Sequence, residues 1–399
     1  MEALFLVTKN YNGDITCERQ PPPPPSFPTL THHHRRSNGS VELDARPQRT
    51  DGRRRPSAGW RRTGIAPFIP IATPTSAFHL PLAAVLFALR APVLAAMTAS
   101  YFLFLQFMPL GSLFQKGILW ICMLVAGVFW VDLQVEGVKR GTLSRYPDRL
   151  PSPGSIIAST FSSPLDAMYL AATFDPIFLV PSFDTPYVFQ LTLLQTIFYT
   201  FTPPTSKPYS TKPTTIAEVV AKNPHRIIVI FPEGTTSNGR ALLRFAPAFD
   251  SFATQYKSSG ENGHGNGKIP KNLIFPISLR YLPSATTTPL PGSYGVFLWR
   301  LLGQPSQTIK VRIGEAVRIG ELEKSTDSLA TTSSSETITE KTIVRSPEDS
   351  AARVPRVGAL EEKVGEILVR VGRIRRVGLG VKEKIGFWNA WKSQGRKKK

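Results

Sequence analysis

Backbone donors, hydroxyl groups and a cation come together between Phe231 and Arg240, where the sequence reads FPEGTTSNGR. The stretch follows Arg226 to Ile230, an apolar run typical of a buried strand. The Pro-Glu-Gly break then forces the chain to turn at the carboxyl end of that strand. Open α/β sheets bind their ligands at that end. We therefore predict a phosphate-recognising loop in which Arg240 or Arg244 pairs with the phosphate.

The same loop offers further donors around such a phosphate. These are the backbone N–H groups of Gly234 and Thr235 and the hydroxyls of Thr235, Thr236 and Ser237. Glu233 has the same sign of charge as a phosphate, so we expect it to orient an Arg or a backbone amide. The alternative interpretation is a plain strand-to-helix turn. The arrival of Gly, Thr, Ser and Asn together with two Arg favours phosphate recognition.

This block resembles the FPEGT block of the glycerophospholipid acyltransferase family, the PlsC-like or lysophosphatidic acid acyltransferases. The family esterifies lysophosphatidic acid and related acceptors with an acyl group from acyl-CoA. The resemblance covers about Ser155 to Ile313. It implies that acyl-CoA is a co-substrate, that no cofactor or metal is bound, and that the block binds the glycerol phosphate. The substrate-binding residues that we predict are Phe231, Pro232, Glu233, Gly234, Thr235, Thr236, Ser237, Arg240 and Arg244.

Acyl transfer to a hydroxyl group requires a base, and His suits that task near neutral pH. In the family a His lies five residues before an Asp that orients it. This chain keeps the Asp, in Ser162 to Asp166 (SSPLD), but has Phe161 at the His position. The resemblance carries Asp166 over as a catalytic residue. A helix-start carboxylate that only interacts with the helix dipole is the alternative interpretation.

Three explanations compete for the missing His. Neighbouring hydroxyls are excluded as bases because an unactivated alcohol is not ionised near neutral pH. A second explanation is that another histidine acts as the base. His225 lies at the wrong end of its strand, about 20 Å from the turn if that strand is extended. His264 lies in a Gly- and Asn-rich loop. A fungal lysophosphatidate acyltransferase-like branch pairs SSPLD with FPEGTTSNGR, so Phe161 is interpreted as a feature of a divergent branch. Loss of catalysis with retained lipid binding is the competing hypothesis.

Composition restricts the partners. A formal net charge of +20 over 399 residues implies nucleic acid, an anionic membrane or a phosphorylated substrate. Nucleic acid is the least favoured, because no aromatic-basic interleaving or known binding module accompanies the charge. Cys17 and Cys122 have no Cys or His at ligand spacing, which argues against a disulfide framework and a zinc site.

Two uncharged runs predict a membrane-associated helical hairpin over residues 80–135. They extend from Ala91 to Leu110 and from Gly117 to Val131, and the first is long enough to span a bilayer. Basic residues flank the pair on both outer sides, which places both ends in the cytosol. The hairpin either crosses and returns or dips into one leaflet. A pair of buried helices in a soluble core is the alternative.

Strand and helix patterns alternate after the hairpin, which predicts an α/β fold with a mixed sheet flanked by helices over residues 150–318. Residues 1–66 and 322–352 are predicted to be disordered. Residues 356–399 predict a basic amphipathic helical tail, either on an anionic membrane surface or packed on the domain. The expected strands are 155–159, 176–180, 226–230, 272–280 and 308–313, and the expected helices start at Ser163–Pro164, cover 190–199 and run from Thr215 to about Asn223.

These predictions lead to one function hypothesis and one alternative. The first is a membrane-bound acyltransferase that converts lysophosphatidic acid to phosphatidic acid, on the cytosolic face of the endoplasmic reticulum or of lipid droplets. The alternative is a catalytically inactive lipid-binding or scaffolding protein on the same fold.

Overall fold

The computed structural model describes residues 66–71, 79–105, 111–205, 212–249, 252, 273–292, 294–318 and 358–396. The chain divides into two units, 1–54 and 55–399, and every described residue belongs to the second. Apart from Ala66, the predicted tail 1–66 lies outside the described residues, as does all of the Ser/Thr-rich segment 322–352. His264 also lies outside them.

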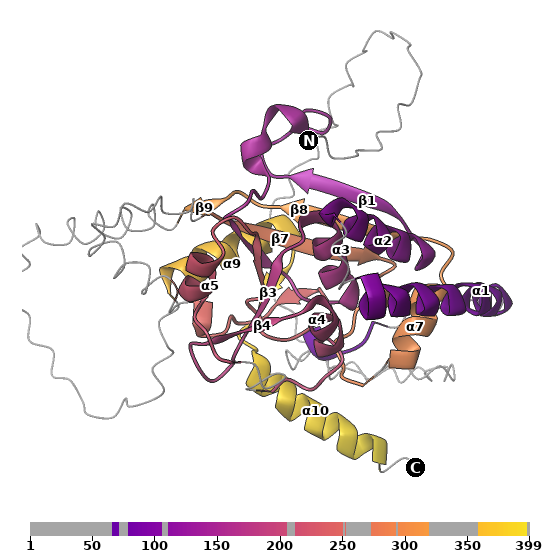
Figure 1. Ribbon diagram of the computed structural model, residues 1–399. Coiled ribbons are helices and arrows are strands. Elements are labelled where there is room, and N and C mark those ends of the chain that lie inside the picture. The colour runs from indigo at the N-terminus through magenta and orange to yellow at the C-terminus, as the bar shows by residue number, and fades with distance from the viewer. Residues whose placement is uncertain are drawn as a thin grey trace, which may run out of the picture. The chain divides into compact units, whose positions relative to one another are not determined.

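A mixed eight-stranded sheet forms the centre of this unit (Figure 1), as the alternation of the sequence predicted. Its order is β1-β8-β7-β2-β5-β3-β4, and β9 pairs with β7. Strands β7, β2, β5 and β3 run parallel to one another, whereas β4 is antiparallel to β3, and β8 and β9 are antiparallel to β7. The bounds are β1 Val128–Val135, β2 Ile156–Ser159, β3 Ile177–Pro181, β4 Val188–Leu191, β5 Ile228–Ile230, β7 Leu273–Leu282, β8 Gln307–Ile313 and β9 Val317–Arg318.

Helices cover both faces of the sheet. One apolar cluster joins the sheet to α2, α3, α4 and α7, and a second joins the opposite face to α5 and α9. Neighbouring strand residues alternate between the two clusters: Phe178 belongs to the first and Leu179 to the second, as the two-residue period of a strand requires. The bounds are α1 His79–Ser100, α2 Ser112–Val125, α3 Pro164–Phe174, α4 Leu193–Tyr199, α5 Ile216–Lys222, α7 Tyr294–Leu302, α9 Ala359–Gly372 and α10 Val381–Arg396.

The predicted helix over 190–199 is wrong at its beginning. Val188–Leu191 is strand β4, antiparallel to β3, and α4 begins only at Leu193. Its N-cap is Thr192, whose hydroxyl accepts the N–H of Gln195 while the Gln195 side chain accepts the N–H of Thr192. This reciprocal pair ends the strand and starts the helix.

The two apolar runs of the predicted hairpin fold differently from each other. Helix α1 continues as a π-helical turn, Tyr101–Leu105, and Leu80–Phe104 is long and apolar enough to cross a membrane by length and composition. The second run is divided between α2 and β1 at Gly127, whose φ of +93° favours glycine. Strand β1 pairs parallel with β8, so the sheet extends into the range predicted for the hairpin.

The C-terminal segment combines a packed helix with a second one that reaches the predicted loop. Helix α9 buries Leu360, Val364 and Leu368 in the cluster on its face of the sheet. Beyond it, β10 (Arg375–Arg376) pairs parallel with β6 (Ala241–Leu242), which follows the FPEGTTSNGR stretch. For α9, the structure thus corresponds to the packed arrangement of the two considered for this tail.

Candidate functional site

Parallel strands bring the predicted site residues to one edge of the sheet. The turn after β2, the loop after β5 and the end of β7 all lie at the carboxyl ends of parallel strands. The Ser237 N–H donates to the carbonyl of Phe161 over 2.9 Å, and the Thr288 N–H donates to the carbonyl of Ser162 over 2.8 Å. The segments of Asp166 and of Glu233, which are 67 positions apart in sequence (233 − 166), are therefore held together.

Asp166 is fully buried at the first turn of α3 and accepts bonds from several donors. Its Oδ2 accepts the N–H of Ser162 (2.6 Å), the N–H of Ser163 (2.9 Å) and the Ser162 hydroxyl (3.2 Å), and its Oδ1 accepts the Tyr281 hydroxyl. Burial raises the pKa of Asp166 to about 6, although these hydrogen bonds oppose the rise. The carboxylate thus closes the capping box of α3 with Ser163 and fastens β7 to the same turn.

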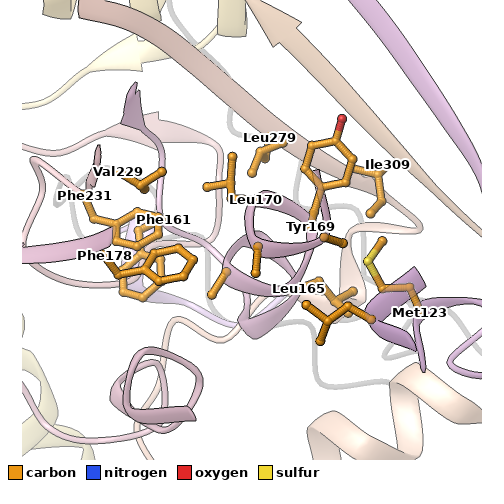
Figure 2. Packing of buried hydrophobic residues seen from close by; sticks show 14 of the residues in the cluster. Met123, Phe161, Leu165, Tyr169, Leu170, Phe178, Val229, Phe231, Leu279 and Ile309 are labelled. Atoms are coloured by element: carbon orange, nitrogen blue, oxygen red, sulfur yellow. The ribbon is translucent and has the colours of Figure 1, made fainter. Parts of the chain in front are cut away.

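Phe161 occupies the family's His position and its ring points into the core. The side chain is 0% exposed. Its ring stacks on Phe231 with centroids 4.1 Å apart, and Tyr199 lies parallel to it at 6.3 Å. Figure 2 shows Phe161, Phe231 and Phe178 as neighbouring rings within the apolar cluster. Phe231, the first residue of the loop, is therefore anchored by Phe161, at the position where the family that the sequence resembles has a histidine.

The loop from Phe231 to Arg240 turns most of its polar groups inward. Gly234 has a φ of +62°, and its carbonyl accepts the Tyr199 hydroxyl at 2.8 Å. The Gly234 N–H donates to the Phe231 carbonyl at 3.0 Å, and the Thr236 hydroxyl donates to the Thr288 carbonyl at 2.7 Å. The Ser237 hydroxyl accepts the Gly239 N–H at 3.3 Å. These groups are buried and bonded to protein atoms.

Lys384 enters the loop from α10. The residue is 2% exposed, and its ammonium donates to the Thr235 hydroxyl (2.9 Å), the Thr236 carbonyl (2.6 Å) and the Thr236 hydroxyl (3.0 Å). An ammonium has three N–H donors, and each of them has an acceptor in the loop. The sequence placed this residue in a tail, and nothing in its local pattern predicted this contact.

Glu233 lies in the same buried cluster. Burial raises the pKa of Glu233 and lowers that of Lys384, and the attraction between the two opposes both shifts. Glu233 also receives hydrogen bonds from the backbone of Leu243 and the side chain of Ser237, while its Oε2 has no partner. We expected Glu233 to orient an Arg or a backbone amide; it contacts a backbone amide, and the nearby cation is a lysine.

A cavity of about 290 Å³ opens beside this cluster, bordered by Ser162, Asn238, Gly239, Arg240 and Tyr281. Three more cations line it, Arg280, Lys310 and Arg312, and among the described residues no acidic one does. Its position at the carboxyl edge of the parallel strands is where such sheets bind ligands. The arrangement is a cation-lined cavity next to the Asp166 turn.

Of the predicted binding residues, Arg240 borders this cavity. Phe231, Pro232, Glu233, Gly234, Thr235, Thr236 and Ser237 are buried behind it. Arg244 is exposed beside α10, where its N–H donates to the Leu379 carbonyl at 2.9 Å and its Cβ lies near Gly380. Of the two predicted arginines, Arg240 is therefore the one that borders this cavity.

Sequence analysis missed the cations of β7 and β8 and the hydroxyl of Tyr281. The β8 sequence QTIKVRI carries a usable signal, because polar and apolar residues alternate from Thr308 to Ile313. Half-buried and buried residues alternate in the same way in the structure. That alternation places Lys310 and Arg312 on one face. Arg280 ended a strand that the sequence did predict. Which loop this face adjoins depends on the strand order, and the sequence does not contain that information locally.

A larger cavity, of about 630 Å³, lies at the amino end of β3, bordered by Tyr101, Lys116, Asp175, Ile177 and Arg226 among others. None of the predicted site residues borders it. The smaller cavity is therefore the candidate active site, because it adjoins the chemistry-bearing loops.

Comparison with known proteins gives one informative relative. No protein-family model matches the chain. The chain is 28% identical over 343 residues to a Schizosaccharomyces pombe protein named "Putative lysophosphatidic acid:oleoyl-CoA acyltransferase". The alignment covers 83% of this chain and 96% of the relative, so it includes both the apolar N-terminal helix and the candidate site within nearly the full length of that protein.

Proposed function

We propose that this chain is a membrane-bound acyltransferase. Its similarity to the S. pombe protein supports a lysophosphatidic acid acyltransferase-like family. It transfers an acyl group from acyl-CoA to a lysophospholipid, with lysophosphatidic acid as the acceptor and phosphatidic acid as the product. The observation that carries the proposal is the alignment with nearly the whole S. pombe relative. The cation-lined cavity beside the Asp166 turn supports it, since both substrates are phosphorylated.

The geometry assigns different tasks to the predicted residues. Arg240 lies at the cavity and pairs with a substrate phosphate. Asp166 and Tyr281 fix the turn that carries Ser162, which borders the same cavity. Glu233 and Lys384 hold the loop from inside. In this assignment Glu233 and Asp166 are positioning residues, and the reaction proceeds without a histidine at position 161.

Membrane association is part of the proposal. Large apolar side chains of α1 and α2 are exposed, among them Leu80, Leu89, Leu113 and Phe114. Arg90 is the charge within α1, and its guanidinium donates to the carbonyls of Leu302, Gln304 and Pro305. That side of α1 is therefore fixed to the domain, and the exposed apolar side chains of α1 and its continuation, within Leu80–Phe104, are the part that contacts the membrane. We place the domain on the cytosolic face of the endoplasmic reticulum or of lipid droplets.

A second candidate function is motivated by Phe161. Position 161 is a phenylalanine, so no imidazole is available where the family that the sequence resembles has its histidine. The Phe161 ring is buried against Phe231 and Tyr199. A lipid-binding or scaffolding protein without turnover is compatible with that substitution. Measurement of acyl transfer separates the two candidates.

The test is acyl transfer by the purified protein in liposomes, with labelled oleoyl-CoA and a panel of lysophospholipids. We expect turnover of lysophosphatidic acid by the wild type and a loss of at least about a hundredfold in Glu233→Ala, because the loop loses its buried anchor. Glu366→Ala, at an exposed position of α9, is the matched control and should retain activity. Wild-type protein that binds the lipids without turnover would favour the second candidate.

A further inference from the structure

We propose that Arg280, Lys310 and Arg312 form a phosphate subsite within the 290 Å³ cavity, in addition to Arg240. The inference rests on the proposed function and adds three residues that bind a phosphate group of one of the two substrates. None of the three belongs to the FPEGTTSNGR stretch.

The sheet topology concentrates these charges. Strands β7 and β8 are antiparallel, and Arg280 stands directly opposite Lys310 in the register. Arg312 is two residues from Lys310 and therefore on the same face of β8. Like charges placed directly opposite each other destabilise a sheet. An arrangement with this cost is expected where an anion binds between the charges.

In the described part of the chain, no carboxylate forms an ion pair with this group. Nearby arginines have acidic partners: Arg149 pairs with Glu315 at 3.1 Å and Arg370 with Glu136 at 2.8 Å. Among the ion pairs of the described residues, none involves Arg240, Arg280, Lys310 or Arg312. The acid nearest in register, Asp132 opposite Lys310, pairs with Arg140 at 3.0 Å.

Hydrogen bonds to the protein fix two of the three cations, and further N–H donors of these cations remain for a ligand. Arg280 Nη1 donates to the Gly372 carbonyl at 3.3 Å, and Arg312 Nη1 donates to the Val371 carbonyl at 3.0 Å. These bonds hold both guanidinium groups at the end of α9, where cations interact favourably with the helix dipole. Arg312 Nε is buried without a partner, and the Lys310 ammonium makes no hydrogen bond to the described part of the chain. The pKa of Arg312 is lowered by burial and by the charges of Arg373 and Arg280, which together outweigh the opposing charge of Asp132, as expected for crowded cations.

Phosphate is the ligand group that this chemistry fits. Guanidinium forks and a lysine ammonium are the side chains that bind phosphate oxygens most strongly. A volume of about 290 Å³ accommodates a phosphate with part of its glycerol or nucleotide, and the long acyl chain must lie elsewhere. The phosphate comes either from the acceptor or from the CoA part of the donor.

Kinetic experiments with matched substrates distinguish the two sources. Lys310→Gln is the key variant because Lys310 has no protein partner to lose. Lysophosphatidic acid is compared with monoacylglycerol, which lacks the phosphate, and oleoyl-CoA with oleoyl-pantetheine, which lacks the phosphates of CoA. Arg312→Lys retains the charge, and Lys363→Gln, at an exposed position of α9, is the control.

We expect Lys310→Gln to raise KM about tenfold for the substrate whose phosphate binds here, equivalent to about 1.4 kcal/mol. The KM of its phosphate-free counterpart should not change. A selective rise for lysophosphatidic acid assigns the subsite to the acceptor, and one for oleoyl-CoA assigns it to the donor. KM values within twofold of the wild type for all four substrates would overturn the proposal.

A binding arm keeps this test independent of turnover. Calorimetric titration of the wild type and of Lys310→Gln with free CoA and with short-chain lysophosphatidic acid needs no catalysis. Weaker binding of one ligand by the variant supports the subsite even if the wild type transfers no acyl group. Equal affinities for both ligands would contradict the subsite, whereas a wild type that binds normally but does not turn over would contradict only the proposed function.

Discussion

Two polar regions at the carboxyl edge of the sheet differ in how their charges are balanced. In the loop cluster, Glu233, Thr235, Thr236 and Lys384 are buried, and the ammonium has three protein acceptors. In the cationic cavity, Arg240, Arg280, Lys310 and Arg312 line an open volume and have no acidic partner among the described ion pairs.

The difference teaches where ligand binding is to be sought. Polar groups whose partners are all within the protein stabilise a conformation, because leaving any of them unpaired costs free energy. Cations without an acidic partner are available to an external anion. In the proposed assignment, the FPEGTTSNGR stretch supplies the scaffold, whereas Arg240 at its end and the cations of β7 and β8 supply the binding groups.

The largest expected effect breaks the loop cluster. Lys384→Met removes three hydrogen bonds and leaves Glu233 beside an apolar side chain, so the free energy of unfolding should fall by about 3 kcal/mol. Lys382→Met is the matched control on the same helix, because Lys382 is exposed and pairs only with Asp184 at 3.6 Å. Its effect should stay below about 1 kcal/mol. Urea unfolding of the detergent-solubilised protein measures both, and equal small losses would show that Lys384 does not anchor the loop.

The next effect concerns pH and Asp166. Its pKa of about 6 in the folded protein lies above the ordinary value of 3.8, so the folded state binds this proton more tightly than the unfolded state. The free energy of unfolding should therefore decrease as pH rises from about 4 to about 6, by about 3 kcal/mol for this group.

Asp166→Asn should lose this slope, whatever its absolute stability, because its side chain does not titrate. Urea midpoints of wild type and variant between pH 4 and pH 7 give the difference between the two profiles. Parallel profiles would mean that the hydrogen bonds from Ser162, Ser163 and Tyr281 outweigh burial.

A moderate effect tests the turn of the loop. Gly234 has a φ of +62°, and an added Cβ would lie 3.4 Å from the Pro181 carbonyl oxygen. Gly234→Ala should cost about 1 to 2 kcal/mol. Gly386→Ala in α10 has open space around it and should stabilise its helix by up to about 1 kcal/mol. Thermal unfolding of the two variants should thus shift in opposite directions, and a harmless Gly234→Ala would contradict the described turn.

The smallest expected effect is the change in stability when a cation of the cavity is neutralised. Without ligand, Lys310→Gln should leave the free energy of unfolding unchanged or raise it by up to about 0.5 kcal/mol, since it relieves repulsion with Arg280. Arg370→Gln breaks the pair with Glu136 and should lower it by about 0.5 kcal/mol. If Lys310→Gln destabilised the ligand-free protein more than Arg370→Gln, Lys310 would have a structural role.

Local signals in the sequence predicted much of the sheet. The apolar runs of β2, β3, β5, β7 and β8 are near their predicted positions, because parallel and central strands are buried on both faces. Ser163–Pro164 marked the start of α3 correctly. Strand β1 was not predicted because its first half, up to Val131, continues the uncharged run of α2. The positive φ at Gly127, where the chain turns from α2 into β1, is a property of the structure.

The site was predictable only in part, for reasons of distance along the chain. The loop and Asp166 have recognisable local patterns, and parallel strands bring them together. Lys384 is 149 positions from Thr235, and its contact depends on how α9, β10 and α10 return to the loop. The inward orientation of Phe161 likewise follows from the surrounding rings of Phe231 and Tyr199, which no spacing rule contains.

The most direct test of an acyltransferase without the family histidine compares wild type and Phe161→His in the same liposomes, with labelled oleoyl-CoA and lysophosphatidic acid. Position 161 faces the aromatic cluster and does not border the cavity, so an imidazole placed there cannot reach a substrate in the described arrangement. We predict turnover by the wild type and no gain in Phe161→His. Turnover that appears only in Phe161→His would contradict the account, because it would show that the chain binds its lipid but lacks the base.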